Sequence, residues 1–562
     1  MKNLIRGLIV FSFFCIKANA QVVAWEWAKT ATCSPSCAVY GLNESVASDA
    51  SGNFYLAQLF NDTITFGSFA LLSDTVSLYI VKYNPSGEVL WARKYADLAQ
   101  YGVNDIETDA LANIYITGSF SSPTVTFGSY TLTNVDSSDI FLAKFDSSGN
   151  VIWAKTGGGT GNDFGNGVTA DAYGNSYITG YFTSPTLIFG TDTLHNIGES
   201  NIFLAKYDVN GNVIWAKSAG GKTYPNRGSS VTIDIYGNVC ITGAIWSDTA
   251  YFGSDTAINL NLGARNVFAT KYDSGGNVIW VKVPNAWESW SNKIASDPFG
   301  NIFITGNFSG LATFDSITLD APAINSYFLT KFDSAGNVIW AKTQTGGNNG
   351  LSEGDELAVD ASGNVYLTGS FDDGSIFFGS IGLPPIVANY FPNFIVKYDS
   401  SGNAIYGFEL KGLSQGSVIC GVALGNHPGE AYFSGYFNVN DLIVGSDSLL
   451  LTGTAAPYVA KIGNSNVGIR EIKTQQTVIV YPNPSSGNFS VIYHFNNKTL
   501  HANFNITDVT GRIVYSTNIS GTEGTQLISI QGLSNGIYYW EMSTAPVDLG
   551  GIIGNGKIVI MK

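Results

Sequence analysis

Hydrophobic and polar residues alternate with a period of two along most of the chain, which predicts β-strands rather than helices. One stretch of about 50 residues shows the pattern clearly, because four short apolar runs are separated there by turns rich in Gly, Asn, Asp and Ser. The runs are Val168–Asp171, Ser176–Phe182, Ile202–Tyr207 and Val213–Lys217. We therefore expect four antiparallel strands, with a small excursion over Thr186–Asn196 between the second and the third.

This four-strand pattern repeats about every 62 residues, a period typical of repeat architectures. The first strand of each complete unit ends at an aspartate, and these are Asp49, Asp109, Asp171, Asp234, Asp297 and Asp360. The last strand follows a phrase such as Asp146–Lys155, DSSGNVIWAK, which reads as a turn and a strand. A degenerate seventh copy covers Val422–Phe437. Four-stranded units of this kind are typical of β-propeller blades, because one such sheet must stack on its neighbours to bury both faces.

The two ends of the repeat region complement each other. The seventh unit stops after its third strand, Tyr458–Ile462, whereas the segment Val22–Lys29 precedes the first complete unit and carries the Trp-Ala-Lys of a fourth strand. We therefore predict an all-β, seven-bladed propeller of four-stranded blades, closed by pairing of Val22–Lys29 with Tyr458–Ile462. Closure removes two open sheet edges. A parallel β-helix and a string of separate small domains are the alternatives, and neither explains the displaced strand.

The units resemble the seven-bladed β-propeller (SBBP-type) repeat of exported bacterial proteins, which is typified by a run like ASGNVYVTG and a later K-Y-D-x-x-G-N strand. The resemblance covers Val22–Gly463. It implies a fold and no particular activity, since propellers support many unrelated functions.

The C-terminal region resembles a second family, the type A C-terminal sorting domain of the Bacteroidetes type IX secretion system. Four landmarks carry the resemblance, and they are Val480–Phe489 (VYPNPSSGNF), Ile506–Val514, Leu533–Tyr539 and Gly556–Lys562. The resemblance implies a small β-sandwich, partnership with the type IX secretion machinery, and passage across the outer membrane. Such a domain is usually then removed, and the cargo is released or attached to surface polysaccharide. An ordinary trailing sandwich domain is the alternative.

The first twenty residues read as a secretory signal peptide, with basic Lys2 and Arg6, an apolar core and a small-residue cleavage site. Cleavage is expected between Ala20 and Gln21. No later stretch is long and apolar enough for a transmembrane helix. The predicted organisation is a signal peptide (1–20), a propeller (21–463), a linker (464–476) and a sorting domain (477–562). We expect a protein that is secreted or held at the cell surface after Sec-dependent export.

The formal net charge of −15 argues against binding to a nucleic-acid backbone, which needs clustered Lys and Arg. In an oxidising compartment Cys33 and Cys37 are expected to form a disulfide, with free thiols as the alternative. Cys240 and Cys420 lie in apolar strand patterns and are predicted to be buried free cysteines. No metal site is predicted, because the cysteines lack further ligands at the spacing of a zinc site.

Two sets of repeated residues suggest chemistry but have structural explanations. The recurrent aspartates offer a ring of oxygen ligands for Ca²⁺, yet an Asp before x-x-Gly-Asn is also what a turn requires, and we favour turn capping. The repeated aromatic residues offer sugar platforms, but residues present in every blade are more often packing residues. They are Trp27, Trp91, Trp153, Trp215, Trp280 and Trp340, with Tyr406 in the remaining unit.

Three tryptophans do not follow the repeat: Trp246, Trp287 and Trp290. The last two lie in a connection between units, where binding residues are often found, so the three are the predicted ligand contacts. No catalytic residues are predicted, because the four histidines form no recognisable triad or metal site. The sequence favours a non-enzymatic binding or scaffold protein for adhesion or for capture of a glycan or protein. The alternatives are an extracellular polysaccharide hydrolase or lyase that uses acids from inter-blade loops, and a structural surface-layer component.

Overall fold

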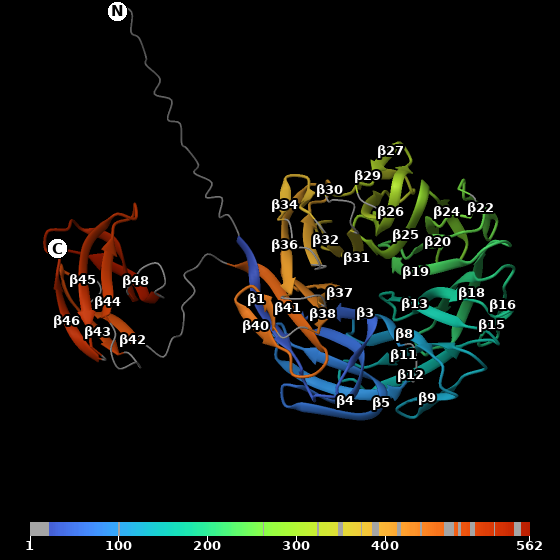
Figure 1. The fold of residues 1–562 in the computed structure, drawn as a ribbon, viewed down its shortest axis with the longest axis horizontal. Coiled ribbons are helices and arrows are strands. Elements are labelled where there is room, and N and C mark those ends of the chain that lie inside the picture. The colour runs from blue at the N-terminus through green and yellow to red at the C-terminus, as the bar shows by residue number, and fades with distance from the viewer. Residues whose placement is uncertain are drawn as a thin grey trace, which may run out of the picture. The chain divides into compact units, whose positions relative to one another are not determined.

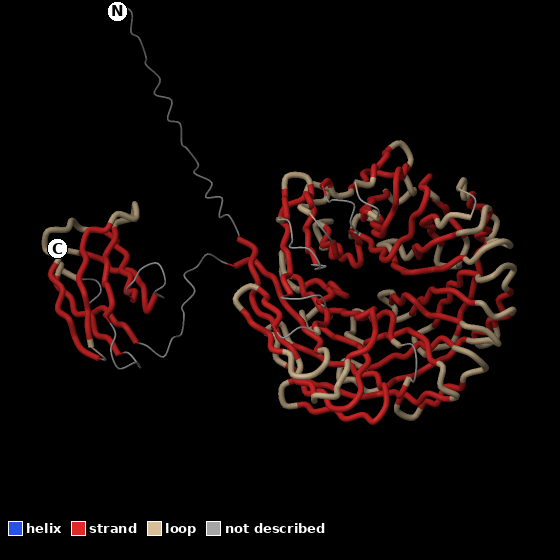
Figure 2. The backbone as a smooth tube through the Cα atoms, in the orientation of Figure 1, coloured by secondary structure: helices blue, strands red, loops and turns tan. Residues whose placement is uncertain are grey.

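A computed structural model describes most of the chain after residue 21. The described ranges are 22–98, 102–261, 263–322, 325–346, 352–371, 374–384, 393–412, 417–438, 441–465, 477–481, 485–494, 501–521, 523–544 and 552–562. The regular structure of these ranges consists of β-strands, which turns and loops connect, so the protein is all-β (Figure 2). The chain divides into two compact units, one ending at Ser465 and one beginning at Asn466.

The first unit contains seven sheets that each have a core of four antiparallel strands (Figure 1). The first sheet consists of β3 (Val39–Ser48), β4 (Phe54–Phe66), β5 (Phe69–Tyr83) and β6 (Val89–Asp97). The second consists of β7 (Val103–Thr108), β8 (Ile114–Phe120), β11 (Asp139–Phe145) and β12 (Val151–Gly157). The third consists of β13 (Asp163–Ala170), β14 (Ser176–Phe182), β17 (Asn201–Tyr207) and β18 (Val213–Gly220).

The next four sheets follow the same order. The fourth consists of β19 (Asn226–Ile233), β20 (Val239–Ile245), β23 (Asn266–Tyr272) and β24 (Val278–Lys282). The fifth consists of β25 (Asn285–Ser296), β26 (Ile302–Phe314), β28 (Ser326–Phe332) and β29 (Val338–Lys342). The sixth consists of β31 (Ser352–Val359), β32 (Val365–Phe371), β35 (Asn393–Tyr398) and β36 (Ala404–Gly412). The seventh consists of β37 (Ser417–Leu424), β38 (Ala431–Phe437), β41 (Ala456–Ser465) and β1 (Val22–Thr30).

Short strands form the excursion between the second and third strands of the units. They are β9 (Thr124–Phe127), β10 (Tyr130–Thr133), β15 (Thr186–Phe189), β16 (Asp192–His195), β21 (Thr249–Phe252), β22 (Asp255–Ile258), β27 (Ile317–Asp320), β33 (Ile376–Phe378), β34 (Ile381–Leu383), β39 (Asp441–Val444) and β40 (Asp447–Leu450). Two further short strands, β2 (Thr32–Cys33) and β30 (Thr345–Gly346), pair with β4 and β33.

The strand β1 pairs antiparallel with β41, so the first strand of the chain completes the last sheet. Trp27 lies opposite Lys461, and Thr30 lies opposite Tyr458. The predicted pairing of Val22–Lys29 with Tyr458–Ile462 is therefore confirmed. In Figure 1 the blue strands of the first sheet and the orange strands of the last lie side by side, and β37 contacts β3.

The first strands of successive sheets contact one another in the order β3, β7, β13, β19, β25, β31 and β37. Large apolar clusters fill the space between neighbouring sheets. For example, Leu78 and Ile80 of the first sheet share a buried cluster with Ile116 and Phe141 of the second. Each sheet thus buries its faces against the sheets beside it, as a four-stranded unit of this size must.

The second unit has two antiparallel sheets around one core. One contains β42 (Thr477–Tyr481), β43 (Asn488–His494) and β46 (Glu523–Ser529), and the other contains β44 (His501–Thr507), β45 (Ile513–Ser520), β47 (Gly536–Thr544) and β48 (Ile552–Ile560). Phe489 and Ile528 from the first sheet and Phe504 and Trp540 from the second lie in the same buried cluster.

Candidate functional site

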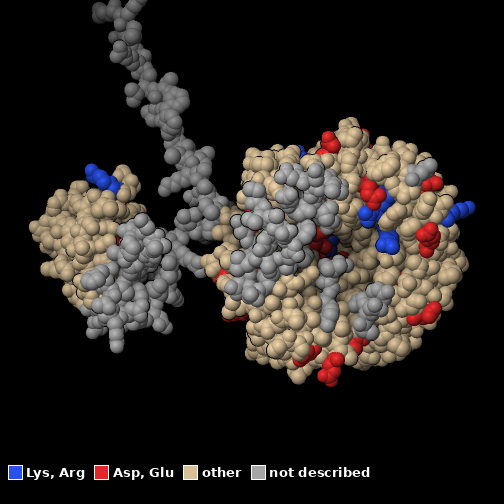
Figure 3. All heavy atoms as spheres, in the orientation of Figure 1, with Lys and Arg blue, Asp and Glu red and all other residues tan. Residues whose placement is uncertain are grey.

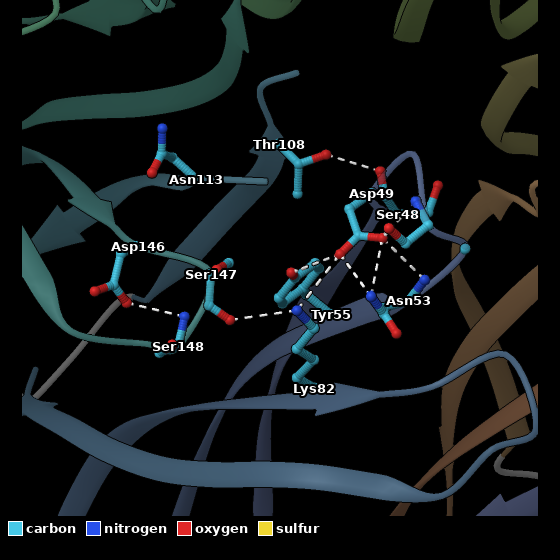
Figure 4. Close-up of polar contacts among 12 residues, drawn as sticks. Ser48, Asp49, Asn53, Tyr55, Lys82, Thr108, Asn113, Asp146, Ser147 and Ser148 are labelled. Carbon is cyan, nitrogen blue, oxygen red and sulfur yellow. Dashed lines mark hydrogen bonds and ion pairs between the residues drawn. The ribbon is translucent and has the colours of Figure 1, made fainter. Parts of the chain in front are cut away.

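The recurrent aspartates are engaged by their own turns, as Asp49 illustrates (Figure 4). Its Oδ1 accepts hydrogen bonds from the backbone N–H groups of Ser51 and Asn53, both at 3.0 Å, and its Oδ2 accepts one from the Tyr55 hydroxyl at 2.9 Å. The Lys82 ammonium lies 3.5 Å from Oδ2. Burial alone would raise the pKa of Asp49, but these hydrogen bonds and Lys82 lower it overall. The turn-capping interpretation is confirmed, and the carboxylate is committed to the fold.

The repeated tryptophans join one sheet to the next. Trp153 donates a hydrogen bond from Nε1 to the carbonyl of Val209 at 3.0 Å, and its ring packs on Gly211, which has a φ of 76°. A side chain at Gly211 would both collide with the ring and strain the backbone. The equivalent contact recurs in six places between a tryptophan and a turn of the Asp146–Lys155 type in the following unit, and we call it the latch. The latch tryptophans are Trp27, Trp91, Trp153, Trp215, Trp280 and Trp340.

The one unit without a latch tryptophan has a topological reason. Tyr406 of the sixth sheet takes the equivalent position, opposite Lys397. The seventh sheet that follows it has no turn between its third and fourth strands, because β41 and β1 come from opposite ends of the unit. Tyr406 therefore has no turn glycine on which an indole ring would pack. The packing interpretation of the repeated aromatic residues is confirmed by these contacts.

The tryptophans outside the repeat behave differently. Trp246 and Trp290 are half-buried and flank the guanidinium of Arg265, whose Cζ lies 5.6 Å from one ring centre and 3.6 Å from the other. Trp287 is exposed over 70% of its surface. The prediction that Trp287 and Trp290 lie in a connection between units is wrong, because both belong to strand β25. The structure thus brings two of the three predicted ligand contacts together, through an arginine that the sequence pattern did not single out.

The stack continues along the fourth sheet and into the third. The Cζ of Arg227 lies 5.7 Å from the Trp246 ring centre and 4.6 Å from that of Tyr181. Tyr181 stacks in turn on Phe164, with ring centroids 4.9 Å apart. We call Phe164, Tyr181, Arg227, Trp246, Arg265 and Trp290 the aromatic–arginine stack. Rings and guanidinium groups alternate along most of its length, an arrangement in which each cation lies over the negative face of a ring.

The positions of these residues follow from the repeat. Phe164, Arg227 and Trp290 occupy equivalent places in the first strands β13, β19 and β25, at the same distance before the recurrent aspartate. Trp246 follows the second strand of the fourth sheet, and Arg265 precedes its third strand. All of them therefore lie at one end of three neighbouring sheets. A rim of loops and strand ends on a rigid scaffold is a common place for binding residues.

The charge of the stack is uneven. Arg265 donates from Nε to Oε1 of Glu288 at 2.8 Å, so part of its charge is balanced. Arg227 is exposed and forms no ion pair with any residue in the described part of the chain. Figure 3 shows separate patches of Lys or Arg atoms, with Asp or Glu atoms beside them, over the region of β19, β20 and β25. This end of the stack is a local cationic site on a protein of net negative charge.

A second singular feature lies where the first strands converge. They line a cavity of about 240 Å³, to which each of the seven contributes residues. Lys293 reaches across from β25 to Asp105 of β7, with Nζ 3.0 Å from Oδ1, and also lies 3.2 Å from a carboxylate oxygen of Glu356 on β31. Asp105 also accepts a hydrogen bond from the Val168 N–H at 2.9 Å. We call Asp105, Glu107, Lys293 and Glu356 the channel cluster.

Burial governs the protonation of this cluster. Burial raises the pKa of Glu356 to about 7 against the opposing pull of Lys293. Burial also raises the pKa of Glu107 to about 7, with the Asp105 charge adding to the effect. For Lys293, burial alone would lower the pKa, but Asp105 and Glu356 raise it well above its usual range. The lysine therefore stays charged while two of its acidic neighbours titrate near neutrality.

The sequence carries a signal for this cluster. Asp105, Lys293 and Glu356 occupy one repeat position, at which other units carry residues such as Gly167 and Ser230. In each of these strands a β-bulge precedes this position, and bulges re-aim the side chains next to them. Charged residues at this position, where other units have small residues, are a departure from the repeat.

The remaining predicted residues have simpler outcomes. The predicted cleavage site at Ala20 and Gln21 lies outside the described residues. Cys33 and Cys37 are both buried and present as thiols, and their contact with each other raises the pKa of Cys33. The disulfide between them stays a prediction. Cys240 and Cys420 are buried free cysteines, as expected. Within the described ranges the structure contains no group of three or more acidic, His or Cys side chains arranged to hold a metal ion, and no helix with the length and hydropathy of a membrane span.

Comparison with known proteins identifies the C-terminal region. Residues 479–547 match the secretion system C-terminal sorting domain. This match supports export through the type IX secretion machinery and a secreted or cell-surface location.

The repeat region has a more distant relative. The chain is 28% identical over 365 residues to an uncharacterized WD repeat-containing protein of Acanthamoeba polyphaga mimivirus, in a match that covers 53% of this chain and 26% of the relative. The chain thus spans about a quarter of that relative's length.

Solved structures show only weak overall similarity. The extracellular domain of a one component system from B. thetaiotaomicron matches with 11% identity and a TM-score of 0.22, covering 93% of this chain and 74% of that one. Cobalt-substituted Synechocystis ACO matches with 11% identity and a TM-score of 0.34, covering 66% of this chain and 72% of that one. Scores at this level carry no argument about function.

Proposed function

We propose that the first unit is a seven-bladed β-propeller closed by β1, and that it works as an exported, cell-surface module for binding or scaffolding. Support for the closed ring comes from the pairing of β1 with β41 and from the contact of β37 with β3. The WD repeat name of the mimivirus relative supports it too, since WD repeats are propeller repeats. The corresponding domain bounds are 21–463 for the propeller and 477–562 for the sorting domain, with 1–20 as the signal peptide and 464–476 as the linker.

The ligand surface in this proposal is the aromatic–arginine stack, and the ligand is a glycan. One observation carries the proposal: Tyr181, Arg227, Trp246, Arg265 and Trp290 form a continuous, partly exposed stack, and most of these residues differ from those at equivalent positions of the other units. Aromatic faces are suited to the apolar faces of sugar rings, and the guanidinium edges are suited to their oxygen atoms. Residues that the fold does not need in every unit are free to serve binding.

The binding proposal is tested with purified mature protein on a glycan array, followed by an assay for released reducing sugar. Binding without release is the expected result. Binding to no glycan would contradict the choice of ligand class. The export proposal is tested by removing Val478–Lys562, which should leave the protein in the periplasm. Normal export of that truncated protein would contradict the role assigned to the sorting domain.

The channel cluster favours one alternative function, a polysaccharide hydrolase. Glu107 and Glu356 have pKa values near 7, which suits general acid–base catalysis at neutral pH. Both acids lie on first strands rather than on the inter-blade loops that the sequence suggested. Release of reducing sugar by the native protein, lost in Glu107→Gln and Glu356→Gln, would establish this alternative in place of the binding proposal.

A further inference from the structure

We infer that the aromatic–arginine stack recognises an anionic polysaccharide, whose carboxylate or sulfate groups bind the edges of Arg227 and Arg265. This inference rests on the proposed glycan-binding function and names the chemical class of the glycan. Four properties of the stack lead to it: the unused hydrogen-bonding edges of its arginines, their rarity in the chain, their fixed positions, and the small size of the cationic patch.

The stack leaves the hydrogen-bonding edges of its guanidinium groups available. Each guanidinium carries five N–H donors in its plane. Rings cover the faces of Arg227 and Arg265, with Cζ to ring-centre distances between 3.6 and 5.7 Å. Glu288 is the hydrogen-bond acceptor for Nε of Arg265. Within the described residues the two guanidinium groups make no other hydrogen bond, and this planar fork matches a carboxylate or a sulfate.

Arginine is rare in this chain, and its placement is selective. The sequence has six arginines, of which three fall between residues 22 and 465: Arg93, Arg227 and Arg265. Arg93 binds the carbonyl of Gly149 and the Asn150 side chain, so it belongs to a latch. The other two both lie near one indole ring, that of Trp246, with Cζ atoms 5.7 and 5.6 Å from its centre. A protein that otherwise relies on lysine has concentrated arginine at the stack.

The stack also fixes its cations before any ligand arrives. Arg265 is held by two rings and by Glu288, and Arg227 is held between Tyr181 and Trp246. A pre-ordered arginine loses less conformational entropy on binding than a free one. Two charged groups beside one aromatic ring suit a polymer that presents both charge and an apolar sugar face.

A polyuronate or a sulfated glycan fits this site better than a nucleic acid does. Nucleic acids present a dense row of phosphates and need many clustered cations. Here the cationic patch is small, and the chain as a whole carries a formal net charge of −15. A glycan with spaced acidic groups places its charge on the two arginines and keeps the rest of its length over neutral surface.

The test measures binding of the mature full-length chain to immobilised polygalacturonate, fully methyl-esterified polygalacturonate and chondroitin sulfate. We expect binding to one or both acidic polymers and at least about tenfold weaker binding to the esterified one, because charge-assisted hydrogen bonds are lost. Raising NaCl from about 0.1 M to about 0.5 M should weaken binding of the native protein to the acidic polymers. Arg227→Gln and Arg265→Gln should each lower the affinity for the acidic polymer about tenfold. The matched control Arg93→Gln should bind like the native protein.

The outcomes separate this inference from the function on which it rests. Equal binding to the acidic and esterified polymers, or full binding by both Arg→Gln variants, would overturn the inference and leave a glycan-binding function in place. Binding to neither these polymers nor any glycan on an array would overturn both. Competition by single-stranded oligo-dT as strong as that by free polygalacturonate would also overturn it, in favour of a nucleic-acid ligand. The two acidic arms tell a carboxylate from a sulfate ligand. Near-native circular dichroism of each variant excludes loss by unfolding.

Discussion

Two sets of aromatic residues in the same seven sheets have opposite relationships to their surroundings. The latch tryptophans are repeated, and each donates to a turn carbonyl and packs on a turn glycine of the next unit. The stack residues mostly differ from unit to unit, and Tyr181, Trp246 and Trp290 lie beside arginines at a partly exposed edge. The comparison indicates that repeated residues of this chain hold neighbouring units together, whereas singular residues at the rim are available for a ligand.

One buried acidic pair shows that departure from the repeat is not sufficient for function. Asp139 and Asp163 are fully buried at the starts of β11 and β13, and the unit that follows has Asn201 where the second unit has Asp139. A singular residue that contacts no solvent has no route to a ligand. Exposure therefore has to accompany singularity before a residue is assigned to binding.

The largest expected effect comes from breaking the closing strand. Removal of Val22–Thr30 deletes the fourth strand of the seventh sheet together with the latch of Trp27. We expect a loss comparable to the whole folding free energy, on the order of 5–15 kcal/mol, because a long edge of β41 becomes unpaired. Thermal unfolding and size-exclusion chromatography measure this directly. A synthetic Val22–Thr30 peptide should restore the native profile and a scrambled one should not. An unchanged melting temperature after the deletion would show that the strand is dispensable.

The next largest effect concerns the buried acidic pair. Burial, followed by the nearby Asp163 charge, raises the pKa of Asp139 to about 6. A raised pKa favours the folded state below the unfolded pKa, and that stabilisation is lost as the pH rises through about 6. Asp139→Asn, which restores the residue of the next unit, should therefore stabilise the protein by about 3 kcal/mol at pH 8 and have almost no effect at pH 4.

Denaturant unfolding of Asp139→Asn at both pH values tests this prediction. Asp136→Asn is the control, since that neighbouring carboxyl is exposed. Equal stabilisation at pH 4 and pH 8 would mean that a packing change, rather than the buried charge, is responsible.

A smaller effect is expected in the channel cluster. Lys293→Met keeps the length of the side chain and removes the charge shared by Asp105 and Glu356. We expect a loss of about 2 kcal/mol at pH 8, which is below the usual cost of breaking a buried ion pair because the cluster is partly exposed. The loss should shrink at pH 5, where Glu107 and Glu356 are protonated. Exposed Lys222→Met serves as the control for denaturant unfolding at both pH values. A loss that grows toward pH 5 would contradict the proposed ion pairing.

The smallest effect tests the turns. Ala112 has a φ of 59°, although the equivalent residues of other units, such as Gly52 and Gly174, are glycines with positive φ. Ala112→Gly removes this strain and should stabilise the protein by about 0.5–1 kcal/mol. Ala110→Gly in the same turn should not stabilise it. The denaturant midpoints of the two variants are compared. Stabilisation by Ala110→Gly together with no effect of Ala112→Gly would contradict the assignment of strain to Ala112.

Much of the fold could be predicted because the repeat shows the same structural signals several times along the chain. The strand pattern, the turn role of Asp49 and its equivalents, the packing role of Trp153 and its equivalents, and the partner of Val22–Lys29 were each indicated several times along the chain. Tyr406 was also predicted as an equivalent residue. Only the structure gives the reason for its substitution, which is the absence of a turn between β41 and β1.

The site could be predicted only in part, because periodicity gives the face of a strand and not its neighbour across the fold. Trp246 and Trp290 were selected as singular residues, but the Arg265 between them was not. Lys293 and Asp105 are 188 positions apart, and nothing local indicates that they meet. A comparison of the units position by position would have marked both Lys293 and Arg227 as departures from the repeat.

One matched pair of substitutions tests the distinction between repeated and singular residues most directly. Trp215 belongs to a latch and Trp246 to the stack, and both are half-buried tryptophans of neighbouring sheets. Each is changed to Ala, and both the melting temperature and the affinity for polygalacturonate are measured below the lower melting point. We predict that Trp215→Ala destabilises the protein by about 3 kcal/mol with unchanged affinity. Trp246→Ala should bind about tenfold more weakly with a nearly native melting temperature. A weaker-binding Trp215→Ala beside a destabilised, fully binding Trp246→Ala would contradict the account.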